Sequence, residues 1–389
     1  MDYYVERLNQ ELTKIIRFWN QHAIQNERFA TQVDSQGNKS FSEPLGSLFI
    51  ARVLYGSSAA ERFSNDISSQ ELSDLSYRTL RNQLSNPNGG YYWTVNEYGE
   101  ILHDERHVSF VQAFVLYGLS EYYALTSDPE VKREMFNQID FIENKIKNTQ
   151  DNSYVDGFDQ DWNPLPDQKR SLGTHLHMLE AYTKFIEVTG DLIYLRRVEN
   201  LLDILLNHFV DLKEGLVYQL FDDKWKLQSN ENWIGHNLEA AWIILQAARL
   251  VKKSEYLDKS INALIILSEN AIEKGFDTKY GGMINRFVGE EALSTDKEWW
   301  PQAEAVIAFL HSYRQNQDKK FLSYAIRLLE YIDNTFSDHV NGEWYESVSR
   351  EGKPLPNQMK LHLWKSMYHN VRYCIETMRQ LEALFIQVA

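Results

Sequence analysis

Cysteine is almost absent from this sequence of 389 residues, which contains only Cys374. A single cysteine excludes an intramolecular disulfide and a structural zinc site built from cysteine thiolates. Proline is also scarce, with 8 residues, and no tract rich in proline, glycine or serine marks a linker between domains. We therefore expect one domain that spans residues 1–389.

Long hydrophobic runs and an excess of basic charge are lacking as well. No apolar run approaches the roughly 20 residues that a membrane-spanning helix needs, and the first residues lack the basic-then-apolar layout of a signal peptide. The net charge of −15 argues against nucleic acid or an anionic membrane as the main partner, because both require a basic surface. We expect a cytoplasmic protein, monomer or homodimer, whose partner is a small neutral molecule.

Short segments rich in glycine and aromatic residues interrupt a chain that otherwise favours helix. Their starts lie roughly 60 to 67 residues apart, which indicates an internal repeat. The segments are GGYYW from Gly89, VDGFD from Val155, EGLVYQLF from Glu214, GGMIN from Gly281 and NGEWYE from Asn341. Two helical patterns lie between successive segments, for example residues 171–188 with 191–211, which gives about twelve helices in six pairs.

The two helices of a pair differ in polarity. The first is apolar on nearly all sides, as in HNLEAAWIILQAARL, while the second carries a charged stripe, as in EYLDKSINALIILSENAI. A helix without a polar face must be buried on every side. We therefore predict an all-α (α/α)6 barrel, with short β-hairpin or loop insertions at one end. An open superhelix of helix pairs is the alternative.

Charged residues recur where the predicted inner helices begin. When HMLEAY, HNLEAAW and PQAEAV are aligned, three glutamates share one register: Glu180, Glu239 and Glu304. The same register, extended by eye, contains Gln112, Arg52 and Arg372. Three residues earlier stand three histidines: His177, His236 and His369. Residues i and i+3 share a helix face, so a closed barrel would bring these groups to one pocket.

Several kinds of catalytic site are disfavoured. His175 and His177 point about 200° apart on a helix, so at most one of them can face the pocket. His103 and His107 fall in a predicted turn, and no HExxH or carboxylate-rich cluster completes a metal site. The phosphate-binding and nucleophile-elbow motifs are absent too. We expect no metal.

Histidine pairs suit proton abstraction from a carbon next to a carbonyl group. Imidazole accepts the proton near neutral pH, while a cationic group such as Arg52 or Arg372 stabilises the enediolate. A buried arginine that neutralises carboxylates is an equal alternative for either residue. Tryptophans beside the histidines favour a sugar ligand, whose apolar face stacks on indole rings: Trp233, Trp299, Trp300 and Trp364.

Four segments stand out together: THLHMLEAYT (174–183), GHNLEAAW (235–242), DKEWWPQAEA (296–305) and WKSMYHN (364–370). With YYWTVN and QAFVLYGLSEYY they extend, in order, over nearly the whole chain. The sequence resembles the N-acylglucosamine 2-epimerase and cellobiose 2-epimerase superfamily. The resemblance implies an (α/α)6 barrel that acts on the open-chain reducing end of sugars, without a metal or nicotinamide cofactor.

The resemblance also implies roles for matching residues. His236 and His369 would move the C2 proton, His177 would assist ring opening, Arg52 would stabilise the enediolate, and Glu239 would hold the substrate. The expected substrate-binding residues are Trp299, Trp364, Trp300, Glu304 and His175.

One departure bears on the substrate. Gly173 stands where disaccharide epimerases of this superfamily commonly have asparagine. The loss of that side chain favours interconversion of D-mannose and D-glucose. The alternatives are a cellobiose or mannobiose 2-epimerase, a mannose–fructose isomerase, a glycoside hydrolase and a non-catalytic sugar-binding protein.

Overall fold

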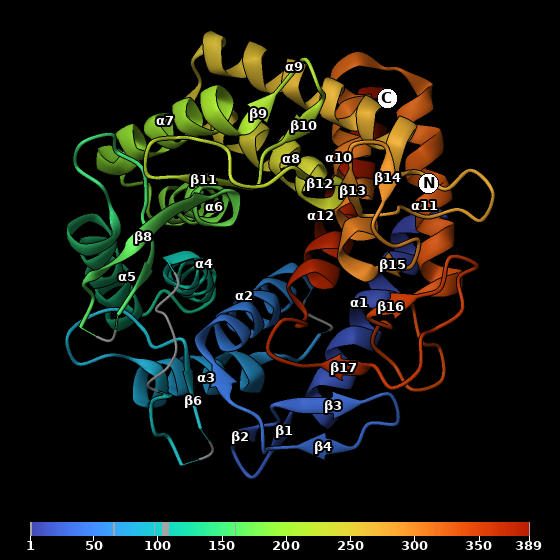
Figure 1. Ribbon diagram of the computed structural model, residues 1–389. Helices are drawn as coiled ribbons and strands as arrows, with labels where there is room; N and C mark the ends of the chain where they lie inside the picture. The colour runs from blue at the N-terminus through green and yellow to red at the C-terminus, as the bar shows by residue number, and fades with distance from the viewer. Residues whose placement is uncertain (1, 65–66, 97, 103–108, 160, 389) are drawn as a thin grey trace.

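Six helices form a closed inner ring in the computed structural model, which describes residues 2–64, 67–96, 98–102, 109–159 and 161–388 (Figure 1). They are α2 (Ser47–Phe63), α4 (Ser109–Thr126), α6 (Leu172–Thr189), α8 (Ile234–Val251), α10 (Trp299–Asn316) and α12 (Tyr368–Val388). Each packs against the next, and α12 packs against α2. The predicted (α/α)6 barrel is confirmed, and the open superhelix is wrong.

Six further helices surround this ring. They are α1 (Asp2–His22), α3 (Gln70–Thr79), α5 (Pro129–Phe141), α7 (Leu195–Ile204), α9 (Ser254–Asn270) and α11 (Lys319–Thr335). Each of α3, α5, α7, α9 and α11 packs on the inner helix that precedes it, whereas α1 packs on α12. The outer helices bury one stripe, as expected from their charged faces; α11, for example, buries Phe321, Ala325, Leu328, Leu329 and Ile332.

The seam between the first and the last helix pairs carries a reciprocal pair of buried hydrogen bonds. Trp19 Nε1 of α1 donates to Glu343 Oε2 at 2.8 Å, and Trp344 Nε1 donates back to Glu11 Oε1 of α1 at 2.7 Å. Both indole rings are fully buried. The outer helix at the start of the chain is thereby fixed to the loop that leads into α12.

Short antiparallel strands gather at one end of the barrel. The two-stranded pairs are β1 (Ile24–Gln25) with β2 (Arg28–Phe29), β5 (Leu45–Gly46) with β6 (Thr94–Val95), β9 (Val210–Asp211) with β10 (Leu216–Val217), and β15 (Lys297–Glu298) with β16 (Ser347–Val348). The three-stranded sheets are β4 (Lys39–Ser40), β3 (Gln32–Asp34) and β17 (Met359–Leu361); β7 (Asp156–Phe158), β8 (Pro164–Ser171) and β11 (Leu220–Asp222); and β12 (Glu231–Trp233), β13 (Arg286–Val288) and β14 (Glu291–Ala292). Strands β5, β8, β12 and β15 lead directly into inner helices, so the insertions and the helix beginnings share one end, as predicted.

A side chain in the first turn of four inner helices binds the backbone of the preceding aromatic segment. The acceptors and the N–H groups they bind are Gln112 with Tyr91 (3.0 Å), His175 with Tyr154 (3.1 Å), Asn237 with Val217 (2.9 Å) and Gln302 with Met283 (2.6 Å). Each bond satisfies a buried backbone donor that would otherwise lack a partner. These residues therefore define equivalent positions in the repeat. Within the described ranges, no helix is both long and apolar enough to cross a membrane.

We predict that two glycine-to-alanine substitutions in inner helices have different effects on stability. A Cβ at Gly118 would lie 2.6 Å from the carbonyl oxygen of Ala51, because α2 and α4 approach closely there, whereas a Cβ at Gly173 would meet nothing within 4 Å. Gly118→Ala should lower the free energy of unfolding by about 1–3 kcal/mol, and Gly173→Ala should not lower it. Urea unfolding measures both, and equal effects would contradict the close approach of α2 and α4.

Candidate active site

A cavity of about 490 Å³ opens where the inner helices begin. Eight of the ten predicted site residues line it: Arg52, His177, His236, Glu239, Trp299, Trp300, Trp364 and His369. Glu304 and His175 do not. Most of the lining residues lie in the first turns of the inner helices. Four of these helices follow directly from strands at this end of the barrel.

Three of the histidines that line the cavity each direct Nδ1 toward an acceptor. The partner atoms are Glu180 Oε2 for His177 (3.1 Å), Gln219 Oε1 for His236 (2.5 Å) and Glu304 Oε1 for His369 (2.7 Å). An acceptor at Nδ1 favours the tautomer that carries its hydrogen there. Nε2 of each ring is then the nitrogen with a lone pair for a ligand in the cavity.

Burial favours the neutral forms of His236 and His369. His236 stacks on Trp233 with ring centroids 4.8 Å apart and lies 5.1 Å from the ring of Trp300, which is also 5.6 Å from His369. This environment lowers the pKa of His236 to about 4, chiefly through burial. Burial likewise lowers the pKa of His369 well below its ordinary value. Both imidazoles can therefore accept a proton at neutral pH.

Arg372 lies beneath the cavity and binds three carboxylates. Its Nη1 donates to Glu180 Oε1 at 2.6 Å, and its Nη2 donates to Glu239 Oε1 at 2.6 Å and to Glu304 Oε1 at 2.7 Å. The guanidinium is 1% exposed and does not line the cavity. Of the two roles open for Arg372, the structure therefore favours neutralisation of buried carboxylates over contact with a ligand.

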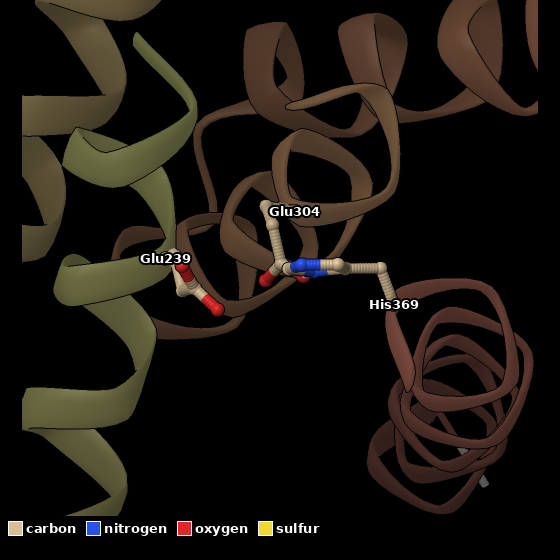
Figure 2. A group of neighbouring side chains, drawn as sticks. All are labelled: Glu239, Glu304 and His369. Carbon is tan, nitrogen blue, oxygen red and sulfur yellow. The ribbon is translucent and has the colours of Figure 1, made fainter. Parts of the chain in front are cut away.

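Glu239, Glu304 and His369 converge from three helices, as Figure 2 shows. One ligand atom from each lies within 4.8 Å of the others, a spacing that a metal ion could bridge. Both carboxylates already accept hydrogen bonds from Arg372, and Glu304 also accepts from His369. The cation at this cluster is thus a guanidinium, which a metal ion would have to displace.

Arg52 is the arginine that lines the cavity. Its guanidinium lies over the rings of Phe114 and Tyr368, 4.3 and 5.0 Å from their centroids, and Nη1 donates to the carbonyl of Trp364 at 3.3 Å. Its Nε has no hydrogen-bond partner among the described residues. Arg52 therefore keeps donors for an anionic oxygen of a ligand.

The structure corrects the assignment of His175 and Glu304 to the substrate site. His175 is fully buried; its Nε2 accepts from the N–H of Tyr154, and its Nδ1 lies 2.8 Å from the carbonyl of Ser171. Glu304 is fully buried as well and orients His369. As expected, only one of His175 and His177 faces the cavity, because they lie on different sides of α6. His103 and His107 lie outside the described residues.

The predicted register of α6 is wrong by three residues. His175 and Asn237 bind equivalent backbone groups, so His177 corresponds to Glu239 rather than to His236. Gln112 is likewise one of these backbone-binding residues and not an equivalent of the glutamates. Three residues are nearly one helical turn, so His177 still faces the cavity, one turn deeper than His236.

Sequence reasoning missed polar residues that the strands contribute to the cavity wall. Glu298 of β15 and Glu346, next to β16, line it with His362, whose Nε2 lies 2.9 Å from Glu346 Oε1. Burial raises the pKa of Glu298. Burial acts to raise the pKa of Glu346, but the hydrogen bond from His362 and the charges of His362 and Lys365 together outweigh it, and the net shift is downward. Their positions follow from pairing between distant strands, which no local pattern reveals.

Aromatic side chains surround the mouth of the cavity. Trp364 is 50% exposed, and its ring lies 5.4 Å from that of Trp93 and 6.4 Å from that of Phe110. Trp299, which also lines the cavity, has a buried Nε1 without a partner among the described residues. The mouth therefore offers flat apolar faces, and its wall offers polar groups.

Comparisons with known proteins show the family of the chain and support its fold. Residues 29–372 match the family model described as N-acylglucosamine 2-epimerase. The cellobiose 2-epimerase of Dictyoglomus turgidum is 31% identical over 97% of both chains, and the D-mannose isomerase of Marinomonas mediterranea is 25% identical over 78% of both. The solved cellobiose 2-epimerase from Bacillus thermoamylovorans superposes with a TM-score of 0.89 and 26% identity, over 98% of this chain and 100% of that one.

We predict that the two pocket-side arginines differ in their contribution to stability. Arg372→Met leaves three buried carboxylates without their common cation and should lower the free energy of unfolding by about 3–5 kcal/mol. Arg52→Met, which breaks no ion pair within the described residues, should cost about 1 kcal/mol or less. Urea unfolding of both variants tests the difference, and equal losses would show that Arg52 is also a structural residue.

We predict that His175→Gln makes stability less dependent on pH. Burial lowers the pKa of His175 to about 4, so between about pH 6.5 and 4 the unfolded chain binds more protons and the native state loses stability as pH falls. Glutamine makes the equivalent backbone bond in α4 and α10, so the variant should fold. The free energy of unfolding of the variant, measured relative to that of wild type, should therefore rise by about 2 kcal/mol when the pH is lowered from 7 to 5. Unfolding curves of both proteins at pH 7 and pH 5 measure this relative change. If the difference between the two proteins were the same at both pH values, the imidazole would not be buried in its neutral form.

Proposed function

Because the chain belongs to the N-acylglucosamine 2-epimerase family and is therefore a carbohydrate epimerase, we propose that it inverts C2 at the reducing end of an aldose through His236 and His369. The observation that carries this proposal is a pair of histidines on α8 and α12, both with Nδ1 bound to an acceptor and Nε2 available to one cavity. Arg52 lies in the same cavity as a source of positive charge.

The proposed reaction begins with an open-chain sugar. One histidine removes the C2 proton through Nε2, and the electron pair moves to the carbonyl oxygen to form a cis-enediolate. Arg52 stabilises the negative oxygen. The other histidine must carry a proton at this stage and returns it to the opposite face of C2; the Glu304 carboxylate at Nδ1 of His369 would stabilise such an imidazolium. His177, one turn deeper, assists ring opening.

We propose a disaccharide of the cellobiose type as the substrate. The relatives named cellobiose 2-epimerases match nearly the whole chain, and the aromatic cluster of Trp364, Trp93 and Phe110 gives a second sugar ring surfaces on which to stack. The second candidate is the D-mannose and D-glucose pair. Gly173 supports it, because the absent side chain removes a possible hydrogen bond to a larger sugar.

A ketose-forming isomerase is the competing function. The D-mannose isomerase relative supports it, and the chemistry differs only in the last step, where the proton returns to C1 instead of C2. Incubation of cellobiose, mannobiose, glucose, mannose and N-acetylglucosamine in heavy water, followed by NMR, separates the functions. We expect the C2 epimer of cellobiose with deuterium at C2. A ketose as the main product would favour the isomerase, and release of monosaccharides from cellobiose would favour a hydrolase.

We predict that His236→Ala and His369→Ala each lower turnover by about 10²–10⁴-fold, because a positioned acid or base contributes that much. The free energy of unfolding should change by about 1 kcal/mol or less, because both residues border the open cavity. His208→Ala, at an exposed residue in the helical turn Leu205–Phe209 that follows α7 and outside the cavity, is the matched control and should keep full turnover. Large losses of stability with little loss of turnover would mean that the histidines are structural.

A further inference from the structure

Gln219 connects the beginnings of two inner helices at the edge of the cavity. It lies between β10 and β11, in the aromatic segment that starts at Glu214. Its backbone carbonyl accepts from the N–H of Leu172, the first residue of α6, at 2.9 Å. Its side-chain Oε1 lies 2.5 Å from Nδ1 of His236 on α8. One residue thus touches both the helix that carries His177 and the helix that carries His236.

The orientation of the Gln219 amide is fixed by a second hydrogen bond. Its Nε2 donates to the carbonyl oxygen of Val217 at 3.0 Å. A carbonyl oxygen only accepts, so the amide nitrogen must face Val217 and the amide oxygen must face His236. If the amide were reversed, two carbonyl oxygens would face each other. An amide oxygen beside Nδ1 requires the hydrogen of a neutral His236 to lie on Nδ1, which leaves the lone pair of Nε2 toward the cavity.

We propose that Gln219 is a positioning residue that holds His236 in the tautomer able to accept the C2 proton. This inference rests on the proposed epimerase function. The C2–H bond breaks, the proton moves to Nε2 of His236, and the electron pair enters the enediolate. Gln219 accepts from Nδ1–H before and after this transfer, so no group besides the imidazole changes its protonation state.

An amide at this position serves His236 differently from a carboxylate. His177 and His369 face Glu180 and Glu304, and a carboxylate strengthens a hydrogen bond from an imidazolium more than a neutral amide does. The charged and titratable groups that act on His236 are Glu239 of its own helix, His177 of α6 and Arg52 of α2. Of these three groups, only Glu239 favours the imidazolium form of His236. His236 therefore releases its proton readily, as a group that must give it up in each cycle should.

Two substitutions separate positioning from packing. Gln219→Met keeps the length of the side chain but removes the acceptor, and it should lower kcat about 10-fold or more, with little change in KM. Gln219→Glu restores an acceptor and should recover kcat, while its charge should move the acid limb of the kcat/KM profile upward by about one pH unit. Gln228→Met, the same change at an exposed residue bonded to Asp222, is the matched control and should behave like wild type.

The tautomer of His236 is also observable without turnover. Nitrogen-15 NMR should show Nδ1–H in the wild type and Gln219→Glu, and a mixture of tautomers in Gln219→Met. Wild-type kcat, pH profile and tautomer in Gln219→Met would overturn the inference, as would a loss of thermal stability alone. If the wild type converts no sugar, the proposed function fails, and the NMR spectra still decide whether Gln219 fixes the tautomer.

Discussion

The ion pairs of Arg372 hold together the part of the molecule on which the candidate site depends. One guanidinium on α12 binds carboxylates of α6, α8 and α10, and so joins four of the six inner helices through a single buried charge. Three carboxylates around one cation leave negative charge that other hydrogen-bond donors must stabilise. Trp242 Nε1 donates to Glu304, and the hydroxyl of Tyr368 donates to Glu180. Two of these carboxylates then orient His369 and His177. The contacts that close the barrel and those that position two of its histidines therefore share the same carboxylates.

The other side of the ring is held by aromatic packing instead. Tyr55 of α2 stacks on Tyr117 of α4 with ring centroids 4.4 Å apart, and the two helices approach closely at Gly118. This half contributes Arg52, whose guanidinium lies over aromatic rings instead of pairing with the buried glutamates. Arg372, on the charged half, thus neutralises buried carboxylates, while Arg52, on the aromatic half, remains available to a ligand. Their separate surroundings explain why two residues at the same predicted register have different roles.

The repeat and the contrast between apolar and charged helices were enough to predict the barrel, because burial on all sides leaves few other arrangements for six apolar helices. Recurrence of histidine and charged residues at helix beginnings, together with the neighbouring tryptophans and the family resemblance, located eight residues of the cavity. It could not fix the register of α6, because HMLEAY matches HNLEAAW by letters while the backbone contact of His175 places it one turn away. Nor could it find Gln219, Glu298 or Glu346, whose positions depend on hydrogen bonds between segments far apart in sequence.

The pairing of α1 with α12 has a consequence for the order in which the molecule is made. Helix α1 is synthesised before the other helices, and although Trp19 can contact Phe49 of α2 early, the main packing partner of α1, α12, follows more than three hundred residues later. Arg372 and His369 emerge with that last partner, so the carboxylates of α6, α8 and α10 are synthesised before the cation that neutralises them. A nascent chain at this stage lacks both the helix that closes the ring and the guanidinium that binds these carboxylates. The final helix completes the ring, its charge balance and its histidine pair in one event.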